Sequence, residues 1–97
     1  MYLKLHKSYK TVIALCDSNL LGKKFEEGVK QIDVRENFYK GEEVSAEVAI
    51  KVLQQQAHEN ATFNIVGKES TEVTVKAGLV KRENIGKIAG IPLVIIV

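Results

Sequence analysis

The chain is short of the residues that crosslink proteins, break helices and anchor membranes. It has one cysteine, Cys16, one proline, Pro92, and no tryptophan among 97 residues. A lone cysteine excludes an internal disulfide, and with two histidines it offers too few ligands for a standard closed zinc site. The longest apolar run, Ile91 to Val97, is far shorter than the ~20 residues that cross a bilayer. We therefore expect no metal, no cofactor and no membrane partner.

A strong excess of one charge is also lacking, because 14 basic residues face 12 acidic ones and the net charge is +2. Only two of the basic residues are arginines, which is few for a dedicated nucleic-acid-binding protein. Basic residues exceed acidic ones in residues 1–30 and 61–97, whereas acidic residues exceed basic ones in residues 31–60. The surface carries patches of both signs if the termini lie together, and the ordinary alternative is that these are simply solvated faces.

The length and composition are those of one folded unit. A hydrophobic content of 45% with 27% charged residues is typical of a folded soluble protein. A chain of this size supports one shared core, so we expect a single domain over residues 1–97. No basic segment followed by an apolar one begins the chain, and a cytoplasmic location is expected.

Alternating apolar and polar residues, or continuous β-prone runs, predict most of a sheet. The expected strands are residues 2–6, 11–16, 29–34, 62–66 and 93–97. The first two indicate a hairpin whose second strand is the more buried. In the third expected strand, residues 29–34, the side chains of Ile32 and Val34 are expected to face the core.

Residues 45–60 have the clearest helical pattern, with apolar residues at i, i+3, i+4, i+7 and i+11 from Ala46. Ser45 is a suitable N-cap, and Asn60 can end the helix in the left-handed conformation. The residues expected to be buried are Ala49, Ile50 and Leu53, and those expected to be exposed are Glu47, Lys51 and Gln54.

Residues 67–80 fit either a strand or a helix. Residues 71–76 alternate like a strand, while other apolar residues of the segment lie at helical spacing. Gly78 followed by Leu79 is typical of a helix end, so a second helix is favoured. The expected fold is an α+β two-layer sandwich, a mostly antiparallel sheet with one or two helices on one face.

A polar, glycine-bounded loop, residues 16–28, follows the second strand. Loops that leave a buried strand often carry the working groups of a small fold. Four charged residues of this loop are expected to form either an acid–base site or an ion-pair network: Asp17, Lys23, Glu26 and Glu27. The loop matches no catalytic or cofactor motif of known mechanism.

Cys16 and residues 66–71 each allow both a chemical and a structural interpretation. Cys16 is either a thiolate nucleophile with His6 as its base or, as is usual at the end of an apolar strand, a buried structural residue. Residues 66–71 superficially resemble a phosphate-binding loop, but an acidic residue separates the lysine from the serine. A strand-to-helix turn capped by Ser70 or Thr71 is the favoured interpretation.

Two loops, residues 7–10 and 22–25, place aromatic rings beside lysines. This composition suits phosphate contact combined with base stacking. The candidate binding residues are Lys4, Lys7, Tyr9, Lys10, Asp17, Gly22, Lys23, Lys24 and Phe25. The five lysines among them are expected to form one face, because the first hairpin and the loop that follows it are contiguous in sequence.

An ordered set of short motifs covers nearly the whole chain. They are Cys16-Asp17, Leu21-Gly22-Lys23 with Phe25 and Gly28, Phe38-Tyr39 with Gly41-Glu42, Val44-Ser45, Asn64-Ile65-Val66-Gly67, Gly78-Leu79-Val80 and Gly90-Ile91-Pro92. Together they resemble the archaeal family called domain of unknown function 424. The resemblance implies an archaeal, cytosolic, single-domain protein with a two-layer α/β sandwich, and it implies no activity. That family's terminal proline is commonly followed by His and Ala, whereas Leu93 and Val94 follow Pro92 here.

Three functions stay open at this point. The first is a non-catalytic binding module associated with RNA or the ribosome. The second is a protein-interaction or homo-oligomeric module, paired as a homodimer through the C-terminal strand, residues 93–97. The third is a small-molecule enzyme that uses residues 16–27. The binding module is the prediction, and an enzyme is the less favoured alternative.

Overall fold

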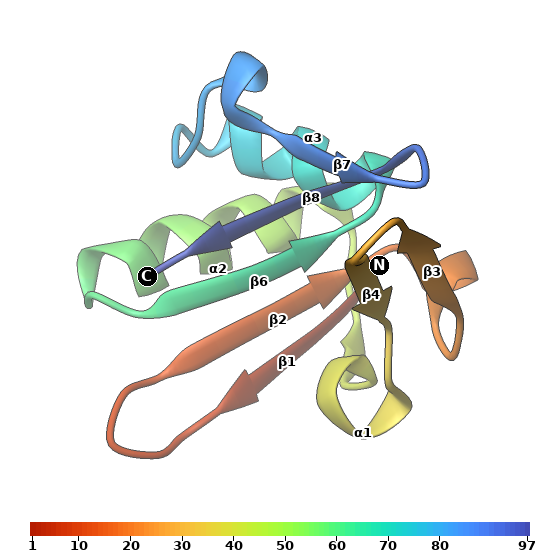
Figure 1. Ribbon diagram of the computed structural model, residues 1–97. Coiled ribbons are helices and arrows are strands. Elements are labelled where there is room, and N and C mark those ends of the chain that lie inside the picture. Colours follow the sequence, from red (N-terminus) through yellow and green to blue (C-terminus); the bar gives the residue numbers. More distant parts are fainter.

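The computed structural model describes residues 1–97 and combines eight short strands with three helices and two 3-10 turns (Figure 1). The elements are, in chain order, β1 (Tyr2–His6), β2 (Val12–Cys16), the 3-10 turn η1 (Ser18–Leu20), β3 (Lys24–Glu27), β4 (Lys30–Asp33), α1 (Glu36–Tyr39), β5 (Glu42–Glu43), α2 (Ala46–His58), β6 (Thr62–Val66), α3 (Lys68–Lys76), the 3-10 turn η2 (Arg82–Asn84), β7 (Gly86–Ile88) and β8 (Ile91–Ile96). Six strands form one sheet in the order β5-β1-β2-β6-β8-β7, and β3 pairs with β4 as a separate hairpin. Every pair is antiparallel except β2 with β6. The expected α+β fold with a mostly antiparallel sheet is confirmed.

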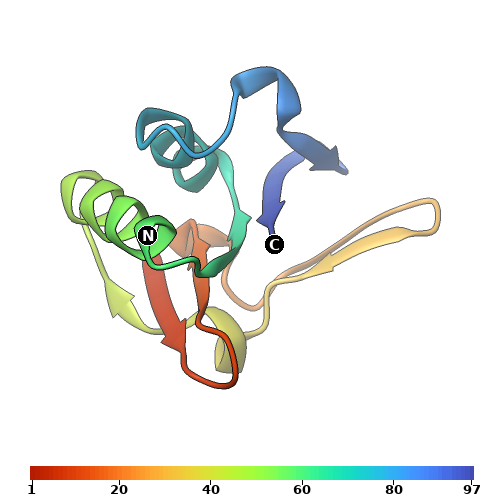
Figure 2. The same cartoon turned by 90° about the vertical axis from the view of Figure 1, so that its left-hand side faces the viewer.

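Side chains alternate along each strand, so the register divides the sheet into two faces. One cross-strand row on the face covered by α2 and α3 consists of Leu3, Leu15, Ile65 and Val94. A row on the opposite face consists of Tyr2, Cys16, Val66 and Leu93. The β3–β4 hairpin and α1 cover part of that second face, and Figure 2 shows them on the far side of the sheet from the helices α2 and α3. The two-layer sandwich therefore gains a partial third layer.

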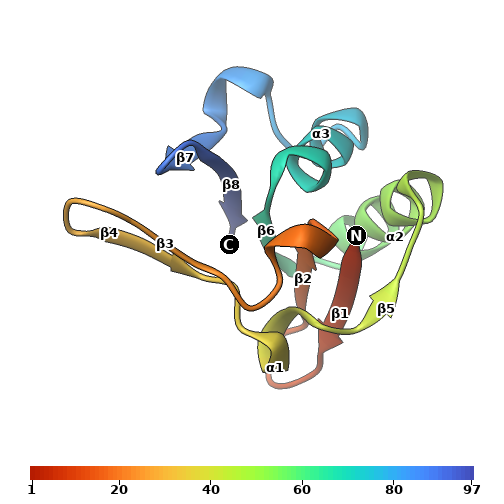
Figure 3. The same cartoon turned by 90° about the vertical axis from the view of Figure 1, so that its right-hand side faces the viewer.

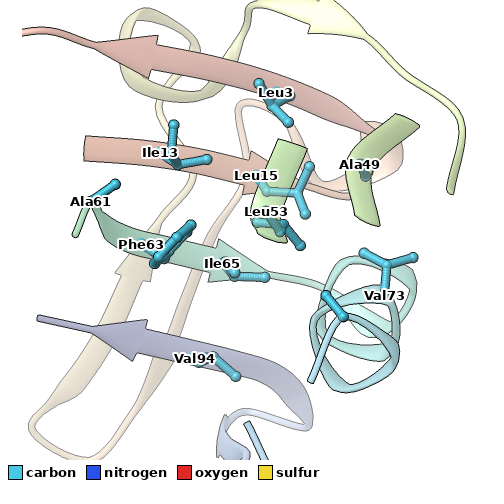
Figure 4. Packing of buried hydrophobic residues seen from close by; sticks show 11 residues of the cluster. Leu3, Ile13, Leu15, Ala49, Leu53, Ala61, Phe63, Ile65, Val73 and Val94 are labelled. Carbon is cyan, nitrogen blue, oxygen red and sulfur yellow. The ribbon is translucent and has the colours of Figure 1, made fainter. Parts of the chain in front are cut away.

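The helix α2 packs on the sheet through the predicted stripe. Ala49 and Leu53 are completely buried, and Ile50 is half-buried. Figure 4 shows Leu53 beside Leu15 in the core between α2 and the sheet. The hydroxyl of Ser45 accepts a hydrogen bond from the Val48 N–H at 3.3 Å, as expected of the N-cap. Glu47, Lys51 and Gln54 are exposed, so the expected orientation of this helix is confirmed.

The ambiguous segment, residues 67–80, forms the helix α3. Val73 and Ala77 are buried against the sheet. After the helix, Gly78 adopts a φ of +83°, and the Leu79 N–H donates to the Thr74 carbonyl at 3.2 Å. These are the features of a glycine-terminated helix end, so the end signal rather than the β-prone alternation determines the conformation.

Three strands lie where the sequence predicted no strand: β3, β7 and the two-residue β5, which pairs with β1. β3 lies inside residues 16–28 and pairs with β4 across a turn in which Gly28 has a φ of +62°. Its four residues include a single apolar one, Phe25, so the alternation has too few members to be recognised. β7, between Gly86 and Gly90, is equally short. β3 and β7 form because their partners β4 and β8 supply the pairing.

Candidate functional site

Asp17 follows β2 and lies at the carboxyl end of the parallel pair β2 and β6. Its carboxylate accepts hydrogen bonds from the Glu69 N–H at 3.1 Å, the Ser70 N–H at 2.8 Å and the Ser70 hydroxyl at 2.7 Å. Only 6% of the residue is exposed. A residue from the neighbouring strand therefore caps α3, and its charge lies at the positive end of the helix dipole.

This close approach requires Gly67, whose φ is +116°. A Cβ atom at this position would lie 2.3 Å from the carboxylate carbon of Asp17. The expected cap from Ser70 or Thr71 is wrong, because Ser70 donates its hydroxyl to Asp17 instead. Since the N-terminus of α3 already holds a carboxylate, residues 66–71 have no free cradle of N–H groups for a phosphate.

Beside Asp17 lies a crevice of about 490 Å³. It opens where the chain leaves β2 and β6 toward opposite faces of the sheet: η1 leads to the β3–β4 hairpin, whereas β6 leads into α3 (Figure 3). Asn19, Lys68 and Lys87 are among the residues that line it. Sequence analysis did not find Lys68 and Lys87 as candidate residues, because they are far from the loop of residues 16–28 in sequence and belong to no motif.

The structure does not bring the five candidate lysines together on one face. Lys7 and Lys10 lie in the turn before β2, whereas Lys23 and Lys24 follow its other end. The five residues of β2 separate these pairs by about 16 Å, at about 3.3 Å per residue. Lys4 lies midway along β1, and its Nζ donates to the Asn37 carbonyl at 2.8 Å.

The tip of the β1–β2 hairpin, residues 7–10, projects from the sheet and all four of its residues are exposed (Figure 2). Tyr9 has a relative exposure of 107%, so its ring contacts almost nothing in the protein. Lys7 and Lys10 form no ion pair, and no acidic residue lies within the tip. The Ser8 hydroxyl donates to the Lys10 carbonyl at 3.1 Å and helps to shape the turn.

The second candidate loop, residues 22–25, is engaged within the fold. The ring of Phe25 is half-buried against the core beneath the hairpin, so less of it is open to stacking than of the Tyr9 ring. Gly22 has a φ of +83°, and its N–H donates to the Val34 carbonyl at 2.7 Å. Nζ of Lys24 lies 3.6 Å from the carboxylate of Glu26. This loop serves mainly to hold the β3–β4 hairpin.

The expected cluster of charged residues after β2 does not form. Asp17 binds the N-terminus of α3, and the carboxylate of Glu27 accepts a hydrogen bond from the Ala89 N–H at 2.7 Å. Glu26 pairs only with Lys24. These carboxylates stabilise separate parts of the fold and make neither an acid–base pair nor a network.

Cys16 and His6 cannot act together. Cys16 pairs with Tyr2, whereas His6 pairs with Val12 at the other end of the β1–β2 ladder. The His6 ring stacks on Phe38 with centroids 4.6 Å apart, and its Nε2 lies 2.8 Å from the Phe38 carbonyl oxygen. Burial and, to a smaller extent, the charge of Asp17 raise the pKa of the Cys16 thiol to about 11. Cys16 is buried, as the structural interpretation predicted.

Neither a metal site nor a membrane-spanning helix is found. No three side chains among the histidines, cysteine and carboxylates gather closely enough to hold an ion. None of the helices combines the length and the apolarity that a bilayer crossing requires.

Comparison with known proteins identifies a family and one similar structure. A family model described as "Protein of unknown function (DUF424)" matches residues 6–97. A crystal structure of an uncharacterised conserved protein from Methanopyrus kandleri is similar, with a TM-score of 0.89 and 29% sequence identity. The similarity covers 98% of this chain and 88% of that one. No curated protein matches the chain.

Proposed function

The chain belongs to the DUF424 family, and we propose that it is a non-catalytic module that binds single-stranded RNA through the tip of the β1–β2 hairpin. The observation that carries the proposal is the complete exposure of Tyr9 between Lys7 and Lys10. An exposed aromatic ring presents a large flat apolar face that can stack on a partner. Single-stranded bases offer such a partner, because each has a flat face that stacks on a ring.

The lysines of the tip supply the second element of RNA recognition. Their ammonium groups are free of carboxylate partners, so they can contact phosphates without breaking an ion pair. They flank Tyr9 along the chain, which suits a strand whose phosphates alternate with stacked bases. The loop of residues 22–25 lacks this arrangement, because Phe25 is packed and Lys24 is paired.

A binding titration with a fluorescein-labelled single-stranded oligouridine tests the proposal. Reversing two charges at the tip, Lys7→Glu with Lys10→Glu, should weaken binding by about a hundredfold or more, since two charged contacts are lost and each is worth about a factor of ten. Tyr9→Ala should remove a stacking contact of about 1 to 3 kcal/mol, and Tyr9→Phe should retain most of it.

The chain supplies its own charge-matched control. The variant Lys23→Glu with Lys24→Glu makes the same change in net charge at the other end of β2. It should bind nearly as well as the wild type. Equal losses in both double variants would show attraction by net charge alone, and absence of binding by the wild type at low salt would also reject the proposal.

Self-association through β8 is the second candidate function. β7 pairs with β8 only as far as Leu93, so residues 94–96 have an unpaired edge on that side. Ile95 is 62% exposed and Val97 is 96% exposed. Charged residues or proline ordinarily protect an exposed strand edge from pairing with another chain. Residues 94–97 contain neither. Two copies can pair such strands antiparallel across a two-fold axis.

Sedimentation of the protein over a range of concentrations tests this second candidate. The wild type should form dimers, and Ile95→Lys should shift the equilibrium to monomers by placing a charge at the paired edge. Val29→Lys makes the same kind of change at the exposed β3–β4 turn and should leave the dimer intact. A wild type that stays monomeric throughout would contradict a β8 dimer.

A further inference from the structure

The parallel strands β2 and β6 form a topological switch point. The chain turns from Cys16 toward the hairpin face of the sheet, and from Val66 toward the helix face (Figure 3). When neighbouring parallel strands are continued on opposite faces, their carboxyl ends leave a crevice between the two connections, and ligands commonly bind in it. The crevice of about 490 Å³ beside Asp17 lies at this point.

The polar side chains around this crevice are mainly hydrogen-bond donors. Lys68 begins α3, Lys87 lies on β7 and Asn19 lies in η1, so three separate elements supply them. Each of the three is exposed, and neither lysine has a carboxylate within ion-pair distance. Asn19, Lys68 and Lys87 therefore border one space, and neither lysine is neutralised by an ion pair.

The acceptors that would otherwise neutralise these donors are already bound. Asp17 directs its carboxylate to two backbone N–H groups and a hydroxyl of α3. Glu27, from the neighbouring hairpin, accepts from the Ala89 N–H. The helix dipole offsets much of the Asp17 charge, so the crevice keeps an excess of positive charge.

We propose that this crevice binds a small phosphate-bearing molecule, with Lys68 and Lys87 contacting the phosphate and Asn19 contacting a neighbouring polar group. A phosphate monoester carries close to two negative charges, which matches the two lysines. The volume is in the range of small-molecule sites, and Leu20, Ile91 and Pro92 supply apolar wall for the organic part of the ligand. This site is separate from the RNA-binding tip, since the length of β2 lies between them.

The test is a two-dimensional amide NMR titration of the whole protein with ribose 5-phosphate, with ribose as the neutral control. Ribose 5-phosphate should produce saturable shifts centred on the amides of Asn19, Lys68 and Gly90, and ribose should produce none. Each of the substitutions Lys68→Ala and Lys87→Ala should weaken binding about tenfold, the value of one charge-assisted hydrogen bond. The spectra themselves show whether each variant is folded.

Two matched variants make the outcome specific. Lys76→Ala with Lys81→Ala removes two exposed lysines elsewhere and should leave the affinity unchanged. Lys7→Glu with Lys10→Glu should weaken RNA binding by about a hundredfold but leave ribose 5-phosphate binding unchanged, so the two proposals fail independently. Shifts that do not saturate, shifts spread over all lysines, or equal effects of the Lys68/Lys87 and Lys76/Lys81 variants would overturn the proposal.

Discussion

At the scale of single residues, Asp17 joins two elements that are distant in sequence. Its carboxylate accepts hydrogen bonds from two backbone N–H groups and one hydroxyl of α3, and the residue is almost completely buried. Removing it leaves three buried or partly buried donors without an acceptor, and such donors are costly. The sequence placed Asp17 in a polar loop, but no local pattern indicates that a helix more than fifty residues later receives it.

Asp17→Ala should therefore lower the free energy of unfolding by about 2 to 4 kcal/mol, which combines the loss of a helix cap with that of charged hydrogen bonds. Glu26→Ala, on the exposed face of β3, is the control and should change it by less than about 0.5 kcal/mol. Denaturant midpoints measure both changes. Equal midpoints for the two variants would show that Asp17 does not stabilise α3.

Two buried acids make the fold sensitive to alkali. Burial raises the pKa of Cys16 from 9.0 to about 11. Burial and, to a smaller extent, the nearby Cys16 raise the pKa of Tyr39 from 10.0 to about 12. The unfolded chain therefore loses these protons at a lower pH than the folded protein does. Deprotonation favours the unfolded state, so this contribution to stability is complete below pH 9.0 and is lost as the pH rises through the folded values.

The thermal unfolding midpoint, measured from neutral pH to pH 11, should fall above pH 9.0. The midpoint of the Cys16→Val variant should fall less steeply with pH than that of the wild type. Valine suits the buried position because it is apolar and close to cysteine in size. The same measurement at neutral pH should show only a modest effect of the substitution. Identical alkaline slopes for the two proteins would contradict a buried, protonated thiol. Rapid alkylation of native Cys16 near neutral pH would contradict it too.

At the scale of elements, the long periodic segments were predictable and the short ones were not. α2 has an N-cap, an apolar stripe and a left-handed end at Asn60, all of which are local signals. β3 and β7 have three or four residues each and are specified by their partners rather than by their own sequences. The candidate site residues divide in the same way. Tyr9 was identified from the lysines beside it in sequence, which is a local signal. Lys68 and Lys87 line one crevice only because the topology of the sheet brings their elements together.

The packing of α2 gives a direct test of the core. Leu53 is completely buried between the helix and the sheet, so Leu53→Ala should cost about 2 to 5 kcal/mol through lost burial and a cavity. Lys51→Ala, on the exposed face of the same helix, should be close to neutral. Both are measured by unfolding in denaturant. A Leu53→Ala midpoint equal to that of Lys51→Ala would show that α2 packs differently.

At the scale of the whole molecule, the two proposed binding sites lie at opposite ends of β2. One end carries the exposed tip with Tyr9 and its lysines, and the other carries the crevice beside Asp17. The sequence predicted one continuous lysine face, because the two loops are close along the chain. An extended strand moves its two flanking loops apart, so closeness in sequence did not become closeness in space.

Salt dependence of RNA binding tests the central claim most directly, because it counts phosphate contacts at a named place. For single strands, the logarithm of the association constant falls with the logarithm of salt concentration by about 0.7 per contact. The variant Lys7→Gln with Lys10→Gln should therefore reduce the steepness of this dependence by about 1.4, and Lys23→Gln with Lys24→Gln should leave it unchanged. A slope that is the same in all three proteins would contradict an RNA site at the β1–β2 tip.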